Sequence, residues 1–504
     1  MTLSAARLAT LIRSDVTLQR RYGFYAVYVF VTVAFALGLR AVPDAELPRF
    51  FTLVVLSDPA LLGFYFVGAL VLFEKGEGVL DALVTTPMSV SEYLLSKVVS
   101  LTALALLVSF GIALLAAGTA FDPVALFVAV GLTVPFYVLV GFVAVARFDT
   151  LNAYFMSAIV YMTALSLPVL GLFGLVESPL FSLFPVQASL VLLAAVFDPA
   201  SATTLAYGVG YLVVATAVAW VAARRAFVRH VVRGGDAGGA SEPATPGGFS
   251  RALGDRTLGG RRLGPVGTMA VADLRKWVQD PLYLYIGLAP VILAAVTRFG
   301  TPYVAARLAG TFDLTPYYPL AVAFVAVFVP GTFGFVAGFF VLEERDQGLI
   351  AAFRTTPLTA EGYLRYRVLS VVLVSFVVAA VCVPLAGLVA VSPAVYVPVA
   401  AVSALWGAVS CFLMASLASN SVEGVAVSKA LGILVTIPLF GVAFVPEPWQ
   451  YALGVFPTFW PAKAFLVGAA SGVTAEFAGL LAVGAVVHLV ALAALQRRFL
   501  ARAD

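Results

Sequence analysis

The feature that most constrains this sequence is a series of apolar runs, each long enough for a helix to cross the ~30 Å hydrocarbon core of a bilayer. In the first half they lie near 24–40, 51–73, 94–117, 123–146, 153–176 and 205–223. In the second half they lie near 282–300, 318–342, 368–391, 393–418, 426–444 and 476–496. The runs are continuously apolar and lack the alternation of a transmembrane barrel. We therefore predict an all-α polytopic membrane protein with twelve transmembrane helices.

The composition excludes a soluble fold and most metal or redox sites. Of the 504 residues, 62% are hydrophobic and 11% are charged, whereas about a quarter of the residues in a soluble domain are charged. Both cysteines, Cys382 and Cys411, lie inside apolar runs, which supports neither a disulfide framework nor a cysteine metal site. His488 is a lone histidine in an apolar run, so we predict a neighbour or a cavity beside it and no metal.

The basic residues indicate how the chain lies in the membrane. With twelve spans, 25 of the 30 Lys and Arg residues fall on one face, which the positive-inside rule makes cytoplasmic. We therefore predict a multi-pass protein of the plasma membrane, surrounded by lipid, with both termini in the cytoplasm. Because topology explains the basic residues, a nucleic-acid partner is not expected. Residues 231–264 are rich in Gly, Ser, Pro and charge, which is typical of a flexible linker between a first unit, 1–230, and a second, 265–504.

The two units are related by an internal repeat. At an offset of 270, residues 71–100 and 341–370 share 12 identical residues in 30, including Glu74 with Glu344 and Tyr93 with Tyr363. Six spans per copy give both copies the same orientation, so the repeat is parallel. The repeat is a stronger indication of a shared partner than any single loop, because this loop is kept in both halves while the loops on the other face diverge. The fold class that we predict is therefore two parallel six-helix repeats, each preceded by an amphipathic elbow helix.

The repeated segment predicts a short cytoplasmic helix between the second and third spans of each unit. A charged turn around Glu74 leads into a short amphipathic stretch, which Pro87 should end because a residue before proline avoids the helical region. Ser89 and Glu92 have the spacing of a capping box, which would start the next helix. The loop would be a short helix held between two transmembrane helices.

This segment resembles the region between spans 2 and 3 of ABC-2 type transporter permeases: an acidic residue, a glycine, a short helix, Thr-Thr-Pro and a Ser/Thr-rich helix start. In that family two six-span units pair, and each gives a coupling helix to one subunit of an ATP-binding dimer. The resemblance implies that this chain is both units fused, similar to permeases for drug export. By resemblance, the residues that couple to the ATPase are Glu74, Lys75, Gly78, Asp81, Pro87, Glu344, Arg345, Gly348 and Pro357.

The sequence predicts no catalytic residues and no cofactor bound by this chain. It contains no G-x-x-x-x-G-K-[ST] motif for a nucleotide phosphate. The resemblance implies that ATP and Mg²⁺ are bound by a separate ATP-binding cassette subunit, as a dimer that receives the two coupling helices. Scarce intramembrane charge favours a lipophilic or amphipathic substrate, and export as its direction follows from the resemblance.

Two alternatives remain open at this stage. A secondary transporter with two parallel halves would need an ion site inside the membrane, and only Asp58 offers one. Asp58 precedes Pro59, however, so it can equally start or kink a helix near the outer surface. An intramembrane enzyme would need clustered catalytic groups, and no span carries paired carboxylates.

Overall fold

The computed structural model describes most of the chain, but not the loops that carry several predicted site residues. The described stretches are 4–40, 46–76, 78–80, 88–148, 165–172, 178–232, 281–308, 313–346 and 360–503, with single residues and short pieces between them. Most of the predicted linker, 231–264, lies outside the described residues. The predicted site residues outside them are Asp81, Pro87, Gly348 and Pro357.

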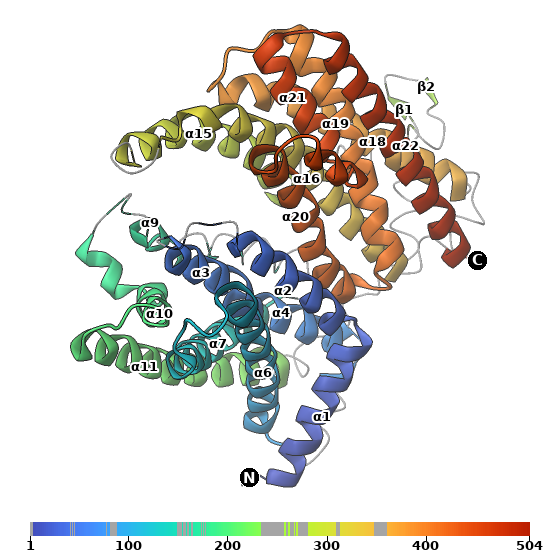
Figure 1. Cartoon of the computed structure of the whole chain (residues 1–504). Coiled ribbons are helices and arrows are strands. Elements are labelled where there is room, and N and C mark those ends of the chain that lie inside the picture. Colours follow the sequence, from blue (N-terminus) through green and yellow to red (C-terminus); the bar gives the residue numbers. More distant parts are fainter. Residues whose placement is uncertain are drawn as a thin grey trace. The chain divides into compact units, whose positions relative to one another are not determined.

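The chain divides into two compact units, Met1–Ser241 and Glu242–Asp504. The first unit runs from blue to green in Figure 1 and the second from yellow to red. Apart from two antiparallel two-residue strands, β1 (Thr257–Leu258) and β2 (Arg261–Arg262), the regular elements in the described stretches are helices. The predicted all-α polytopic architecture is confirmed.

Unit 1 begins with two helices joined at a sharp bend. Helix α1 (Ala5–Arg21) is amphipathic and carries several charges, whereas α2 (Phe24–Arg40) is apolar throughout. The two meet at 68°, and Gly23 between them has a φ of 71°, a conformation that glycine adopts without strain. Helix α1 is therefore the predicted elbow, and α2 is the apolar member of the bent pair.

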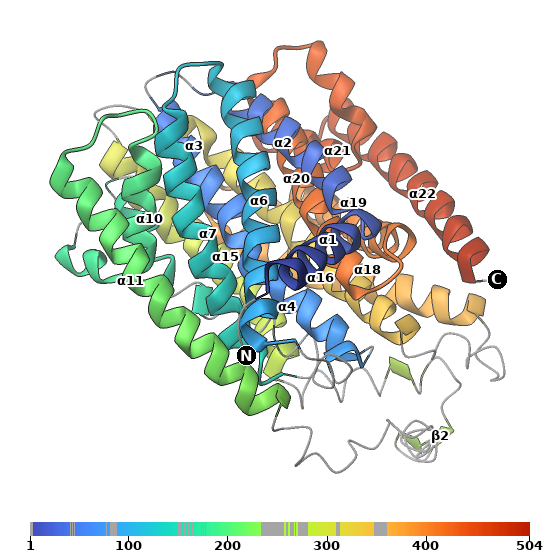
Figure 2. The same cartoon turned by 90° about the horizontal axis from the view of Figure 1, so that it is seen from below.

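The rest of unit 1 is built around α4 and α7. The remaining elements are α3 (Leu47–Val55), the π turn η1 (Leu56–Ala60), α4 (Leu61–Gly76), α6 (Val90–Ala117), α7 (Pro123–Val145), α9 (Val169–Leu172), η2 (Pro179–Leu183), α10 (Pro185–Ala194), α11 (Ala202–Phe227) and a second π turn, η3 (Val228–Val232). Figures 1 and 2 both place α6 beside α7. A Cβ on Gly141 of α7 would lie 2.8 Å from the carbonyl oxygen of Phe64, so the backbones of α4 and α7 touch.

Unit 2 repeats this plan with α16 and α19 at its centre. Its elements are α15 (Pro281–Leu308), η4 (Thr315–Tyr317), α16 (Tyr318–Asp346), α18 (Ala360–Ala386), α19 (Pro393–Leu417), α20 (Ser421–Phe444), η5 (Trp449–Val455), α21 (Phe459–Ser471) and α22 (Ala475–Ala503). A Cβ on Gly334 of α16 would lie 2.0 Å from the carbonyl oxygen of Gly407 in α19. Only glycine permits this approach.

Eight helices among the described residues are long and apolar enough to cross a membrane, or nine if α1 and α2 count as one bent span. The eight fall within 90–117, 123–145, 202–230, 287–307, 315–342, 362–386, 393–417 and 475–499. The predicted span 153–176 is described only in part, and α9 (Val169–Leu172) is the helix given within it. The chain is an integral membrane protein, and the number twelve remains a prediction.

Candidate functional site

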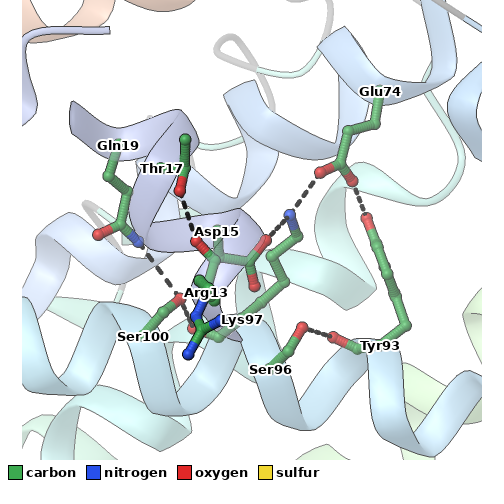
Figure 3. Close-up of polar contacts among 9 residues, drawn as sticks. All are labelled: Arg13, Asp15, Thr17, Gln19, Glu74, Tyr93, Ser96, Lys97 and Ser100. Atoms are coloured by element: carbon green, nitrogen blue, oxygen red, sulfur yellow. Dashed lines mark hydrogen bonds and ion pairs between the residues drawn. The ribbon is translucent and has the colours of Figure 1, made fainter. Parts of the chain in front are cut away.

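The candidate site is a buried polar cluster at the base of the first repeated loop, where α1, α4 and α6 meet (Figure 3). The carboxylate of Glu74, near the end of α4, accepts hydrogen bonds from the Tyr93 hydroxyl and the Lys97 ammonium of α6. Lys97 Nζ also lies 2.6 Å from Asp15 Oδ1 of α1. Their side chains are 2% (Lys97), 6% (Asp15) and 7% (Glu74) exposed. We call Asp15, Glu74, Tyr93 and Lys97 the loop-base cluster.

Local helix geometry brings these groups together. Tyr93 and Lys97 are four residues apart in α6, so they lie on one face of that helix. The Lys97 ammonium lies 5.4 Å from the centre of the Tyr93 ring, and the aromatic face favours a cation there. On α1, Gln19 is one turn beyond Asp15 and donates to the Ser100 hydroxyl. The elbow helix is thus bound to α6 by an ion pair and a hydrogen bond.

The cluster holds two carboxylates and one ammonium, so its formal charge is −1 when Asp15 and Glu74 are ionised. Burial raises the pKa of Asp15, and the neighbouring Lys97 charge opposes that effect. Lys97 is therefore the cation that pairs with both acids, and a buried charge is tolerated only when it is paired.

Unit 2 carries the same arrangement at positions 270 residues further on. The carboxylate of Glu344 accepts a hydrogen bond from the Tyr363 hydroxyl, and Arg367 Nη2 lies 2.6 Å from Glu344 Oε1. The guanidinium carbon of Arg367 lies 5.5 Å from the centre of the Tyr363 ring. The cation and the tyrosine thus hold the same places around the glutamate in both units. The residue matching Asp15 in the sequence, Asp273, lies outside the described residues.

The basic residue after each glutamate faces the end of a different helix. Lys75 Nζ lies 3.5 Å from the carbonyl oxygen of Phe148, just beyond α7. In unit 2, Arg345 donates to the carbonyl oxygens of Ala415 and Ala418, at the end of α19. Carbonyl groups at a helix C-terminus are unpaired and carry partial negative charge, so a cation is stabilising there. Each Glu-basic pair therefore joins the loop to two further helices.

The start of α6 is fixed by the predicted capping box, which the structure confirms. The Ser89 hydroxyl accepts from the backbone N–H of Glu92, and the Glu92 carboxylate accepts from the backbone N–H of Ser89. The same carboxylate also accepts from the backbone N–H of Ser4 and from the side chain of Arg7. The Glu92 carboxylate therefore joins the start of α1 to the start of α6.

The remaining predicted residues have less defined places. Gly78 follows α4 with a φ of 67°, which explains a glycine there. Asp58 lies in the π turn within Leu56–Ala60, and its side chain lies outside the described residues. His488 is buried and its Nδ1 lies 2.7 Å from the carbonyl oxygen of Gly484. Within the described stretches no group of three His, Cys, Asp or Glu residues could hold a metal ion.

Sequence reasoning found the glutamates and the tyrosines but missed the cations. Lys97 and Arg367 differ in identity, so the count of identical residues passed over them. The signal was present, because each cation stands 23 residues after its glutamate and four after its tyrosine. Sequence reasoning placed Glu74 in the coupling region but did not predict that its side chain would be only 7% exposed.

Duplicated helical units with a matching cluster at the base of each loop define a class, that of membrane permeases built from two related halves. Residues 6–234 match the Fluoroquinolones export permease protein family. Residues 273–496 match a second description, Fluoroquinolones export permease protein Rv2686c-like. The chain belongs to the fluoroquinolone export permease family, consistent with its resemblance to ABC-2 type permeases.

Two curated relatives come from Mycobacterium tuberculosis (strain ATCC 25618 / H37Rv). Fluoroquinolones export permease protein Rv2686c is 32% identical over 237 residues, which are 46% of this chain and 92% of the relative. Fluoroquinolones export permease protein Rv2687c is 33% identical over 230 residues, which are 45% of this chain and 97% of the relative. Each relative is therefore about half as long as this chain. No solved structure matches the chain.

Proposed function

We propose that this chain is the transmembrane subunit of an ATP-driven exporter, with two permease halves joined in one polypeptide. Half-length relatives that carry the name of export permeases support the fusion. ATP and Mg²⁺ would be bound by a separate ATP-binding cassette subunit, as a dimer that meets one loop from each unit. The distribution of basic residues supports a plasma-membrane protein with both termini in the cytoplasm.

The observation that carries this proposal is the loop-base cluster and its repeat around Glu344. A loop that receives a push from a partner must be joined firmly to the helices that it moves. Glu74 makes that connection from inside the unit, since its carboxylate is buried against α6. We therefore assign Glu74 and Glu344 a positioning role in coupling. Contact with the ATPase would fall on more exposed loop residues such as Val79.

The names of the relatives suggest the substrate. They are called fluoroquinolone export permeases, and we propose that this chain moves amphipathic drugs of that kind out of the cell. Such a substrate agrees with the scarcity of charge in the apolar helices. The chain itself would perform no covalent chemistry.

The test is drug transport into inverted membrane vesicles that contain the chain together with a candidate ATP-binding subunit. We expect uptake of a fluoroquinolone that requires ATP, resists a protonophore and disappears when the ATPase carries an inactivated Walker A lysine. Uptake that ignores ATP and collapses with the protonophore would instead favour the secondary transporter, with Asp58 as the first residue to replace. Co-purification of the two proteins from detergent provides an independent readout.

The coupling role of the cluster is tested by Glu74→Gln combined with Glu344→Gln. We expect this variant to keep its binding of the ATPase but to lose much of the drug stimulation of ATP hydrolysis, because the loops remain present but are held less firmly. Arg49→Met is the matched control, since the Arg49 ion pair with Glu46 is exposed and such pairs contribute little. Unchanged stimulation in the double variant would contradict the positioning role.

A further inference from the structure

Unit 2 has a second polar group at the end opposite its repeated loop. Arg345 contacts the carbonyl oxygen of Ala418 at the loop end of unit 2. Helix α20 begins just after Ala418, at Ser421, so its last residue, Phe444, lies at the opposite end of the unit. The segment that follows, residues 445–458, leads through η5 into the short helix α21. Tyr317, just before α16, lies at the same far end, because its ring stacks on Phe444 at the end of α20.

At this far end the charged side chain of Lys463 is largely buried. Its side chain on α21 is only 11% exposed, and its ammonium pairs with Glu447, whose side chain is 58% exposed. The ammonium also lies 5.9 Å from the centre of the Tyr451 ring. An ammonium has three hydrogen-bond donors, and Glu447 is the acceptor found for it within the described residues. Lys463 thus has donors left for a second acceptor.

Unit 1 provides an internal control for this pair. Aligning Phe456-Pro457 with Phe184-Pro185 places Val191 opposite Lys463 and Leu175 opposite Glu447. The short helix α10 forms in unit 1 with this apolar residue, so the fold does not require the ion pair. Because a buried ammonium costs solvation free energy that an apolar residue does not, the structure of the unit alone gives no reason for Lys463.

A stack of aromatic rings stands just before Glu447 in the chain. The rings of Phe440 and Phe444 are 5.9 Å apart at 19°, and those of Phe444 and Tyr317 are 5.6 Å apart at 30°, so the three form a stack. More than half of each phenylalanine side chain is exposed. Two residues separate Phe444 from Glu447, so their Cα atoms are at most about 11 Å apart. The stack and the ion pair therefore lie at the same end of unit 2, on consecutive segments of the chain.

We propose that Lys463 and this aromatic stack bind a planar aromatic carboxylate, the chemical class to which fluoroquinolones belong. The ligand carboxylate would replace Glu447 on the Lys463 ammonium while its ring stacks on Phe444. One carboxylate exchanges for another, so the charge around the buried ammonium is unchanged. The displaced Glu447 side chain is already mostly in solvent, so its release costs little. The proposal rests on the drug-export function proposed above and adds a substrate site in unit 2.

The test is equilibrium binding to the purified full-length chain in phosphatidylcholine nanodiscs, followed by fluorescence polarisation. The probes are norfloxacin and decarboxylated norfloxacin. We expect Lys463→Met to weaken norfloxacin binding at least tenfold and to leave the decarboxylated probe unchanged. Phe444→Ala should weaken both probes. Glu447→Gln should strengthen norfloxacin binding, because the competing carboxylate is gone, an effect that a purely structural pair would not produce.

Two variants separate binding from folding. Lys463→Met combined with Glu447→Gln removes both charges and should bind norfloxacin as weakly as the single lysine variant, with a thermal midpoint near that of the wild type. Arg49→Met removes a cation from an exposed pair and should bind both probes normally.

The proposal is overturned if Lys463→Met binds both probes as the wild type does, or loses both equally. It is also overturned if Glu447→Gln weakens norfloxacin binding. If the wild type exports the drug in vesicles and the variants export it equally well, this site fails while the export function stands. If the wild type neither binds nor exports any probe, both proposals fail together.

Discussion

The sharpest prediction concerns Lys97, on which two buried carboxylates depend. In Lys97→Met, Asp15 and Glu74 lose the ammonium that pairs with both. Breaking one buried ion pair by removing a partner costs about 3–5 kcal/mol. Because two acids are left unpaired and both are nearly inaccessible to water, we expect a loss at the upper end, about 5 kcal/mol in the free energy of unfolding of unit 1.

The loss is measured as the thermal midpoint of the monodisperse protein in detergent at one fixed heating rate. For a domain of this size, 1 kcal/mol corresponds to roughly 2–4 °C, so the expected decrease is on the order of 10 °C. The triple variant Lys97→Met, Asp15→Asn, Glu74→Gln removes all three charges and should recover most of it. Arg49→Met serves as the control, with a change within about 2 °C because its pair is exposed.

Two results would refute the reasoning. One is a midpoint for Lys97→Met that matches the control. The other is a triple variant no more stable than Lys97→Met, because the loss would then come from packing around the lysine stem and not from unpaired acids.

Three further predictions follow from the same structure. Arg367→Met should cost less than Lys97→Met, about 2–3 kcal/mol, because the Glu344 side chain that it pairs with is 18% exposed, whereas the Glu74 side chain is 7% exposed; equal midpoints for the two variants would contradict this. Gly334→Ala should lower the midpoint by at least several degrees, since its Cβ would meet the Gly407 carbonyl at 2.0 Å, while Gly432→Ala, with nothing within 4 Å, should not. Burial raises the pKa of Asp15, so the folded protein binds the Asp15 carboxyl proton more tightly than the unfolded chain does. Protonation of Asp15 therefore stabilises the fold. This contribution is fully present below about pH 4 and is lost as the pH rises through the raised pKa. The lysine variant should therefore regain part of its midpoint when the pH falls from about 7.5 to about 5.5, and an unchanged deficit would show that Asp15 does not carry it.

Much of the fold could be predicted because membrane-spanning helices need long apolar runs, and these are visible in the sequence. The predicted spans at 94–117 and 393–418 differ from α6 and α19 by only a few residues. The capping box of Ser89 starts α6 before the apolar run begins. The π turn at Leu56–Ala60 was not predicted. Hydropathy averages over a window, so it does not register a local change in hydrogen bonding.

The site was predicted only in part, for a physical reason. The repeat identified Glu74 and Tyr93 as residues that matter, but hydropathy places a charged residue after a span at the surface. A nearby cation reverses that expectation, because a paired charge can be buried. Lys97 follows Glu74 at a distance of 23 residues, across a loop whose path the sequence does not give. The contact therefore became visible only in three dimensions.

The Lys75 contact with the end of α7 has a mechanical consequence. Helices α4 and α7 touch backbone to backbone at Gly141, well inside the unit. At the loop, Lys75 of α4 reaches the carbonyl of Phe148 just past α7. Two helices joined at two separated points cannot slide or splay independently. A force applied to the loop would therefore rotate α4 and α7 together about the contact at Gly141.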